Sequence, residues 1–531
     1  MRVRLSLSQR RWDVVCLVLA LGLAAYICWK NAILASRIVD GQHWFYLDDD
    51  MMISMRYGRN LAEGHGLVWN PGERVEGYTN FLWTMVMAGV HKLGAQDRTA
   101  SLWMRVVGFV LLGGSLAQML RVLRALSPRS LLAPPVMFLA TLFCADVMWW
   151  SAWGFETSLL TFLFLTFVAS VLHDPKSIVA WVALSLVPLT RADGLHLFLS
   201  CAVVGLVLVP ERKDALVRAA LAAVPVVLHL AFRRVYYGEW FPNTYFLKVY
   251  LLEDPGERGF VYARSFVFTY PIPLALAAAG AVAIARRDRR ALLFFLLVGG
   301  TLAYVSRTGG DMMGNFRFCA HLMPLVFVFA AAGIAHVVQH RAGRWAWATA
   351  LLVATVPLQK PLERVIAFDG NGDPREQIVV ASLVNKNALP DASIGVIAAG
   401  IVPYFTRRYA VDVLGKSDKH VARLKPWPGA MVGHGKLDPA YSLGARRPDL
   451  VVSCRNLHYA SQLKAGNRNH DPVYSFLSSY AFIDLYRPFP IHEDFTTGTT
   501  ALYTHAGSRE AQRRHWKSVG VGSWPPPAPW P

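Results

Sequence analysis

The stretch FYLDDDMMISMRYGRN, from Phe45 to Asn60, places three consecutive aspartates ahead of two arginines. If a helix begins at the aspartates, one face carries residues at steps of three or four, which are neighbours along a helix, namely Asp49, Met52, Arg56 and Arg59. An acid would then share a helix face with two groups that bind anions. A carboxylate beside a phosphate site can act as a general base or orient a hydroxyl nucleophile. The alternative is a helix N-terminus, where the dipole favours carboxylates without any chemistry.

The composition indicates a membrane protein. The chain is 54% hydrophobic and 17% charged, and its mean hydropathy is +0.33, whereas a soluble domain has about a quarter of its residues charged. Several apolar runs approach the length that crosses a bilayer, so we predict a polytopic α-helical protein with about eleven spans, the first of them uncleaved. The predicted spans centre on 14–34, 99–120, 131–150, 155–172, 177–190, 195–210, 215–232, 263–285, 291–305, 318–338 and 345–358.

One short segment decides which side of the membrane each loop faces. TNFLWTMVMAGVHKLG, residues 79–94, is marginal for crossing. If it crosses, the arginines of RVLRALSPR fall outside. If it lies in the interface or re-enters, the basic segments MRVRLSLSQRR, RVLRALSPR, PERKD, ARRDRR and HRAGR all fall inside, as the positive-inside rule favours. We therefore predict an interfacial helix here, which places the polar motifs outside.

Three regions follow from this topology. The transmembrane domain covers 1–358, with a first external loop over 35–98. Strand-like runs such as ASIGVIAA, DLVVS and FIDLY alternate with turn-rich segments after the last span, which predicts a small external α/β domain over 359–515. The final residues, 516–531, include SWPPPAPWP and form a Pro-rich tail.

Basic residues at the predicted outer ends of spans are candidate phosphate ligands. A single arginine there can extend along the lipid boundary to reach water. Several that converge would form a pocket for a lipid-linked phosphate. Gly309, Gly310 and Gly314 would let backbone N–H groups approach an oxyanion. The candidate cations are Arg191, Arg234, Lys248, Arg307 and Arg317.

Several functional classes lack a motif. The chain has no P-loop, Rossmann glycine pattern, GxSxG elbow or HExxH helix, and its six cysteines show no zinc spacing. The net charge of +19 is spread between apolar runs, which argues against a nucleic-acid partner. A transporter of lipid-linked sugars is an alternative, although transporter sites lie nearer mid-membrane. No cofactor is predicted with certainty, but an acidic cluster could bind a divalent cation.

The ordered motifs resemble the terminal β-(1→2)-arabinofuranosyltransferases of actinobacterial cell walls and related bacterial GT-C glycosyltransferases. They are DDDMMISMRYGRNLAEGHGLVWNPGERVEGYTNFLW, WGFETSLLT, LTRADGL, FRRVYYGEWFPNTYFLK, GGDMMGNFRF and YAVDVLGKSDKHVARL, over residues 45–440. The resemblance implies a GT-C fold with interfacial helices in the first external loop. It also implies a decaprenyl- or undecaprenyl-phospho-arabinofuranose donor and an acidic catalytic group in that loop.

The resemblance singles out two of the three aspartates. The family's Asp-Asp pair and the isoleucine that follows match Asp49, Asp50 and Ile53, so Asp49 is the first candidate for the catalytic carboxylate and Asp50 the second. Asp48 has no counterpart. The two methionines after the pair, and those in GGDMMGNFRF, depart from the family pattern, which bears on the identity of the sugar. Further candidates for sugar or acceptor contacts are Arg56, Arg59, Glu76, Tyr78, Asn80, Glu156, Asn243, Asp311 and His321.

The resemblance also implies a location and partners. It places the protein in the bacterial cytoplasmic membrane, with the active site and the C-terminal domain facing the periplasm. The acceptor would be a glycan, a lipid or a pilin, and mannose or aminoarabinose are alternative donor sugars, on lipid A or pilin. We expect Asp49 or Asp50 to activate the acceptor hydroxyl or stabilise the anomeric centre, while the cations hold the leaving phosphate.

Overall fold

The computed structural model describes residues 6–127, 129–251, 255–311, 313–338, 374–426, 432–453, 486–488 and 501–505. The chain divides into two compact units. The first comprises Met1–Leu67, Tyr78–Pro242 and Leu251–Gly370, and the second comprises Val68–Gly77, Asn243–Tyr250 and Asn371–Pro531. The predicted span over 345–358 and the Pro-rich tail over 516–531 lie outside the described residues.

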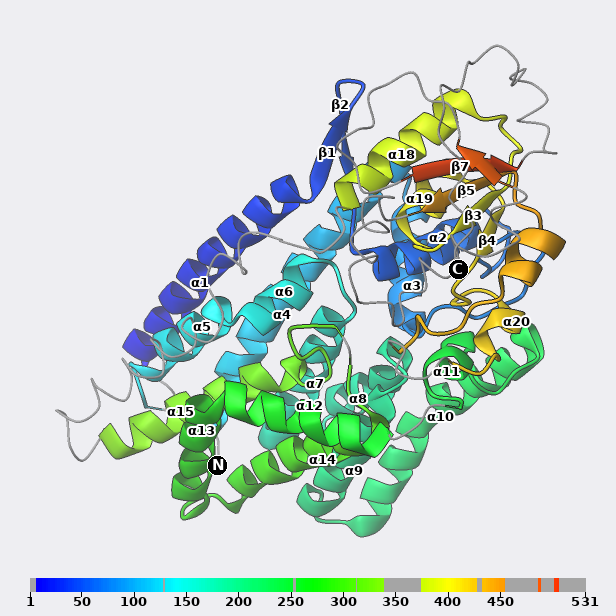
Figure 1. Cartoon of the computed structure of the whole chain (residues 1–531). Helices are drawn as coiled ribbons and strands as arrows, with labels where there is room; N and C mark the ends of the chain where they lie inside the picture. The colour runs from blue at the N-terminus through cyan, green and yellow to red at the C-terminus, as the bar shows by residue number, and fades with distance from the viewer. Residues whose placement is uncertain are drawn as a thin grey trace. The chain divides into compact units, whose positions relative to one another are not determined.

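The first unit is built from helices. The long helix α1 leads into a short hairpin formed by β1 (Ser36–Val39) and β2 (Gln42–Phe45), as Figure 1 shows. The helices of this unit are α1 (Leu7–Leu34), α2 (Asp49–Ala62), α3 (Phe81–Lys92), α4 (Asp97–Leu126), α5 (Ala133–Phe143), α6 (Ala145–Ala152), α7 (Thr157–His173), α8 (Ile178–Thr190), α9 (Gly194–Leu208), α10 (Arg212–Tyr237), α12 (Pro255–Thr269), α13 (Pro271–Ala285), η1 (Arg289–Leu292), α14 (Leu293–Thr308), η2 (Ala320–Leu322) and α15 (Met323–Val338).

The apolar helices agree in kind with a multi-pass membrane protein. In the described part of the chain, four helices are long and apolar enough to cross a membrane, namely α1, α4, α10 and Arg289–Thr308, and two bent pairs would raise the number to six. Further apolar helices of 10 to 17 residues are α7, α8, α9 and Ala320–Ala335. The count of about eleven spans stays a prediction. Helix α3 has only 12 residues, about 18 Å of rise. The expectation that this segment does not cross stays a prediction.

Two of the predicted spans are broken helices rather than straight ones. Helices α5 and α6 meet at 67° around Cys144, and α12 and α13 meet at 82° around Tyr270. Tyr270 precedes Pro271, and a residue before proline is disfavoured in the helical region. Cys144 is extended, with φ −75° and ψ 109°. The Tyr270 hydroxyl donates to Asp146 Oδ2 at 2.6 Å, so a buried hydrogen bond joins the two breaks.

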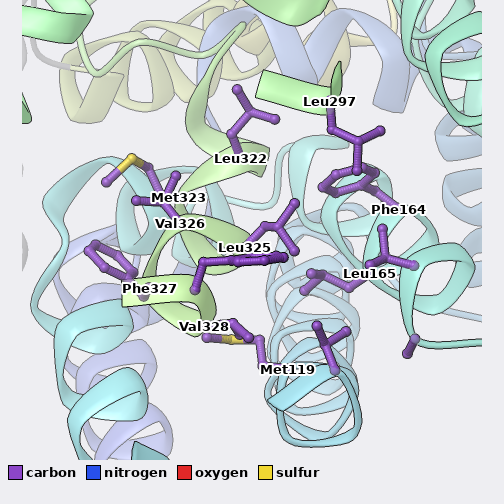
Figure 2. Packing of buried hydrophobic residues seen from close by; sticks show 14 of the residues in the cluster. Met119, Phe164, Leu165, Leu297, Leu322, Met323, Leu325, Val326, Phe327 and Val328 are labelled. Atoms are coloured by element: carbon purple, nitrogen blue, oxygen red, sulfur yellow. The ribbon is translucent and has the colours of Figure 1, made fainter. Parts of the chain in front are cut away.

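The core of the first unit surrounds α15. Leu325, Val326, Phe327 and Val328 are all 0% exposed, and four consecutive buried residues require neighbours on every side of the helix. Figure 2 shows their side chains near Met119 of α4, Phe164 and Leu165 of α7 and Leu297 of α14. Helix α13 crosses α15 through two facing glycines, Gly280 and Gly333. Small residues of this kind let helix backbones approach closely in membrane proteins.

The glycine contact gives a stability prediction. A Cβ atom at Gly280 would lie 2.4 Å from the Phe329 carbonyl oxygen and 3.0 Å from Gly333 Cα, whereas a Cβ atom at Gly299 of α14 meets nothing within 4 Å. Gly280→Ala should therefore lower the free energy of unfolding by about 1–3 kcal/mol through overpacking. Gly299→Ala is the matched control and should leave it unchanged or slightly raised. Thermal unfolding of the detergent-purified protein measures both, and equal stability of the two variants would contradict the close crossing.

The second unit contains a five-stranded mixed sheet in the order β4-β3-β5-β7-β6. The strands β3, β4 and β5 run parallel to one another, and β7 is antiparallel to β5 and β6. Figure 1 shows β3, β5 and β7 side by side, next to α18 and α19. The elements are α11 (Asn243–Lys248), α18 (Pro374–Asn387), β3 (Ile394–Val396), α19 (Ile401–Thr406), β4 (Ala410–Asp412), α20 (Lys419–Ala422), η3 (Ala440–Ala445), β5 (Leu450–Ser453), β6 (Tyr486–Pro488) and β7 (Ala501–His505).

Two segments from predicted external loops belong to this second unit. In the segment Val68–Gly77, the Asn70 side chain pairs with the edge strand β4. Asn70 Nδ2 donates to the Ala410 carbonyl at 2.8 Å, and Asn70 Oδ1 accepts from the Ala410 N–H at 3.1 Å. The side-chain amide thus takes the place of a neighbouring strand along part of the sheet edge. Trp69 Nε1 also donates to the Ala399 carbonyl beyond β3, at 3.2 Å.

Candidate active site

Helix α2 begins inside the aspartate cluster. Asp48 is its N-cap, and the Asp48 side chain accepts a hydrogen bond from the Asp50 N–H at 3.0 Å. Asp49 and Asp50 occupy the first turn, beside backbone N–H groups that have no acceptor within the helix. All three side chains are partly buried. The cap gives Asp48 a structural role that the sequence pattern did not assign.

The body of α2 is fixed against α3 and α4. A Cβ atom at Gly58 would lie 2.9 Å from both Ala88 N and Met87 Cβ of α3, so only glycine allows this approach. Arg59 is 3% exposed, and its Nη1 lies 3.3 Å from Asp97 Oδ2 in the first turn of α4. This ion pair gives Arg59 a protein partner and anchors the helix that carries the aspartates.

Asn80, the N-cap position of α3, connects α2 with the segment before α7. Asn80 Oδ1 accepts from Ser54 Oγ at 2.8 Å and from Thr84 Oγ1 at 3.1 Å. Its Nδ2 donates to Glu156 Oε2 at 3.3 Å. Asn80 and Glu156 are 3% and 4% exposed. A buried amide with both ends bonded holds a fixed orientation, so Asn80 positions the Glu156 carboxylate.

The second oxygen of Glu156 faces Arg191, which ends α8. Arg191 donates two parallel hydrogen bonds to Asp193, from Nε at 2.8 Å and from Nη2 at 3.0 Å. Arg191 Nη1 lies 3.3 Å from Thr157 Oγ1 and 3.8 Å from Glu156 Oε1. Burial by itself would raise the pKa of Asp193, but the Arg191 guanidinium outweighs it and holds that pKa below its usual value.

Arg317 is the second cation of this cluster, and 11% of its side chain is exposed. Its Nε lies 2.6 Å from Asp311 Oδ2, but the N–H does not point along that contact, so this is an ion pair without an aligned hydrogen bond. The guanidinium also lies 5.7 Å from the centre of the Trp150 ring. Burial by itself would lower the pKa of Arg317, but the charges of Asp311, Glu156 and Asp50 outweigh it and raise that pKa. Asp50 of α2 therefore shares one electrostatic environment with Glu156 and Arg317.

The glycines before Arg317 have structural explanations. Gly309 follows the last residue of α14 and has φ +97°, the left-handed conformation that commonly ends a helix. Gly310 has φ +66°, and a Cβ atom there would lie 2.6 Å from the Tyr262 ring. Both positions require glycine for backbone conformation or packing. Their expected approach to an oxyanion stays a prediction.

Other predicted site residues of the first unit lie in different surroundings. Arg234 is exposed near the end of α10 and donates to the Gly238 carbonyl at 2.8 Å. Arg307 is exposed in the last turn of α14. Arg56 is buried in α2, at 1% exposure. The Tyr78 ring packs edge-on against Tyr57 at 5.0 Å, which places it in an aromatic cluster rather than on the surface.

Three predicted site residues belong to the second unit, namely Glu76, Asn243 and Lys248. The Glu76 carbonyl accepts from the Asn243 N–H at 2.9 Å. Asn243 Nδ2 lies within hydrogen-bond distance of three carbonyls in the segment after β4, at 2.9 Å from Gly415, 3.1 Å from Lys416 and 3.0 Å from Asp418. Asn243 thus joins an external-loop segment to this unit.

A further positioning residue, Arg105, was not singled out in the sequence. It is 4% exposed within the apolar helix α4. Its Nη1 donates to the Ala152 carbonyl at 2.6 Å and its Nη2 donates to the Tyr46 carbonyl at 2.9 Å. Arg105 thereby fixes the chain two residues before Asp48. The signal was present, since an arginine inside an apolar run is a functional candidate by default.

No three His, Cys, Asp or Glu side chains converge as a metal site within the described residues. The divalent cation that an acidic cluster could bind stays a prediction.

The buried pair gives the second prediction. Asp193→Leu or Arg191→Met alone should lower the free energy of unfolding by about 3–5 kcal/mol, because each leaves an uncompensated buried charge. The double variant should lose less than either single variant, because it removes both charges. Denaturant or thermal unfolding of the purified protein measures this cycle. Additive losses in the double variant would show that the two side chains do not depend on each other.

One protein-family model matches a stretch that lies almost entirely in the second unit. The family model named Domain of unknown function (DUF8728) matches residues 369–508. This stretch falls within the predicted external domain over 359–515. No curated protein matches the sequence.

Solved structures of GT-C glycosyltransferases share a similar fold over most of this chain. ArnT from Cupriavidus metallidurans bound to undecaprenyl phosphate is 13% identical, with a TM-score of 0.57 over 92% of this chain and 98% of that one. The arabinofuranosyltransferase AftD from mycobacteria is 13% identical, with a TM-score of 0.51 over 96% of this chain and 40% of AftD. AglB from Archaeoglobus fulgidus, in complex with an inhibitory peptide and a dolichol-phosphate, is 11% identical, with a TM-score of 0.50 over 95% of this chain and 75% of AglB. The GT-C fold expected from the sequence motifs is confirmed.

Proposed function

We propose that this protein is a membrane glycosyltransferase that moves D-arabinofuranose from a polyprenyl phosphate to an extracytoplasmic glycan or protein acceptor. The observation that carries the proposal is the contact of Arg191 with Glu156, together with Arg317, on which the charges of Glu156 and Asp50 act. This cluster combines acids with a buried cation, Arg191, and a largely buried one, Arg317. Cations so placed can stabilise the charge that develops on a leaving phosphate. Two solved structures of similar fold contain undecaprenyl phosphate or dolichol-phosphate, which supports a lipid-phosphate donor. The choice of arabinofuranose rests on the sequence motifs.

The cluster suits a displacement at the anomeric carbon. Asp50 or Asp49 takes the proton of the acceptor hydroxyl as its oxygen bonds to the anomeric carbon. The bond between that carbon and the phosphate oxygen breaks, and the electron pair leaves with the phosphate. Arg191 and Arg317 bind the charge that develops on the phosphate. Asp49 is the first sequence candidate for this base and Asp50 the second, and the charge of Asp50 acts on Arg317.

The location follows from the same proposal. The apolar helices support a multi-pass protein. The positive-inside bias of the loops supports the proposal that the cluster and the C-terminal domain face the periplasmic side of the bacterial cytoplasmic membrane. Arg234, Arg307 and Lys248 stay candidates for further contacts with the donor phosphate, and the C-terminal domain is a candidate for acceptor binding.

The catalytic assignment is tested by removing one carboxylate charge at a time. Asp50→Asn should lower transfer from synthetic polyprenyl-phospho-arabinofuranose by about a hundredfold or more, since a general base contributes that much. Asp49→Asn measures the first sequence candidate in the same assay. Asp48→Asn is the matched control, because asparagine caps a helix as well as aspartate does and the charge change is identical.

The outcomes separate the three aspartates. Loss in Asp50→Asn or Asp49→Asn with near wild-type transfer in Asp48→Asn supports a catalytic carboxylate in the first turn of α2. Full activity in both Asp50→Asn and Asp49→Asn would contradict the assignment of a catalytic carboxylate to this helix turn. Equal losses in all three variants would show that the cluster acts through its total charge.

Competition between donor lipids tests which sugar the protein transfers. In proteoliposomes with a suitable acceptor, unlabelled polyprenyl-phospho-arabinofuranose should reduce transfer from the labelled compound at least tenfold more effectively than the mannose or aminoarabinose analogue. Stronger competition by one of these analogues would show that its sugar, and not arabinofuranose, is the donor sugar. Movement of the donor across the bilayer without its cleavage, and without dependence on acceptor, would instead favour a transporter.

A further inference from the structure

Two histidines lie beside the Arg191–Asp193 pair. His321 is 1% exposed, and neither of its ring nitrogens has a hydrogen-bond partner among the described residues. His196 Nε2 likewise has none there, while His196 Nδ1 contacts the Asp193 carbonyl oxygen. Buried polar atoms are almost always paired in folded proteins. Three unpaired nitrogens in one place therefore point to a polar group that binds between the rings.

The contact with Asp193 determines which nitrogen of His196 carries the proton. A carbonyl oxygen can only accept, so His196 Nδ1 is the N–H donor and Nε2 presents a bare lone pair. A neutral His321 has one N–H donor and one acceptor nitrogen. The pair thus offers an acceptor on one ring and a donor on the other. A hydroxyl group matches both, because it donates one hydrogen bond and accepts others.

The separation of the rings fits one intervening oxygen. Their centres are 6.5 Å apart, at an interplanar angle of 57°. A direct N–H···N hydrogen bond would bring the centres to about 5.2 Å, whereas one oxygen bonded to both rings at a tetrahedral angle gives about 6.4 Å. The observed distance is too long for a direct bond between the two imidazoles and leaves room for a single oxygen between them.

Aromatic neighbours hold both rings in place. His196 stacks on Tyr304, with ring centres 4.1 Å apart and planes 8° apart. His321 meets the edge of Phe164 at 5.7 Å and 89°. Because Arg191 binds Asp193 with two hydrogen bonds, the carbonyl that orients His196 is fixed as well. Each imidazole thus has an aromatic ring against one side, and the Arg191–Asp193 pair lies beside both.

We propose that His196 and His321 form a subsite beside Arg191 that binds one hydroxyl group. The hydroxyl donates to His196 Nε2 and accepts from the His321 N–H. If Arg191 binds the donor phosphate, which rests on the proposed function, a hydroxyl of the attached sugar is one source of this group. A buried water that supports the Arg191–Asp193 pair is the other source. Neither histidine takes part in bond breaking, so both are positioning residues.

Structure determination of the full chain in lipid nanodiscs tests the subsite without an activity measurement. Data are collected with no ligand, with undecaprenyl phosphate and with undecaprenyl-phospho-arabinofuranose. We expect density for one oxygen within hydrogen-bond distance of both rings. Density in all three states identifies water, and density only with the sugar-bearing lipid identifies a sugar hydroxyl. The absence of density between the rings in every state, or a direct bond between the two imidazoles, overturns the proposal.

Binding measurements with His321→Phe give an independent readout. If the sugar supplies the hydroxyl, wild type binds undecaprenyl-phospho-arabinofuranose about tenfold more tightly than a deoxy-sugar analogue, because a polar subsite rejects a ligand that lacks its partner. His321→Phe loses this preference and keeps its affinity for undecaprenyl phosphate. If water supplies the hydroxyl group, His321→Phe weakens the binding of all three ligands equally.

The matched control is His229→Phe. His229 contacts Phe81 and Arg233 instead of the pair, so this variant keeps the wild-type pattern. His321→Phe with wild-type binding of every ligand contradicts the subsite. If the wild-type protein binds the lipids but transfers no sugar, the proposed function is wrong and the subsite proposal is unaffected. The search for density between the two rings does not depend on sugar transfer.

Discussion

The helical unit depends on the pairing of charges that its own folding buries. A charged side chain in an apolar bundle is costly unless a partner and hydrogen bonds compensate it. Arg191 and Arg317 meet this condition through Asp193 and Asp311. The Arg191–Asp193 pair lies in the turn between α8 and α9, where backbone groups at helix ends also need partners. This requirement gathers polar chemistry into one place in an otherwise apolar unit.

Much of the fold could be predicted because hydrophobic run length and loop charge are strong signals. The start of α2 at Asp49 follows from helix-end chemistry. The apolar run that contains α3 was recognised as marginal for crossing a bilayer because it is short. The breaks at Cys144 and Tyr270 were not predicted, since both runs are apolar throughout. Pro271 marks one break, but no proline marks Cys144. The inclusion of loop segments in the second unit depends on side-chain bonds such as that of Asn70, which no periodicity reveals.

The site was only partly predictable because contacts between distant residues decide which charges meet. Helical spacing grouped Asp49 with Arg59, but Arg59 pairs with Asp97 of another helix. The motif around Arg191 was recognised as polar, yet its bidentate bond with Asp193 has no signature in a single sequence. His196 was missed because a histidine inside an apolar helix resembles any buried polar residue. Four carboxylates act on Arg317, and they come from separate parts of the chain, so no local pattern shows that they converge.

The most direct test of the account is the affinity of the purified protein for polyprenyl phosphate, measured by calorimetric titration in wild type and in Arg317→Gln. This largely buried cation should contribute to phosphate binding, so the variant should bind at least tenfold more weakly. Arg264→Gln removes an exposed arginine of α12 and should bind as wild type does. Unchanged affinity in Arg317→Gln, in a variant that unfolds at the wild-type temperature, would contradict the assignment of this cluster as the phosphate site.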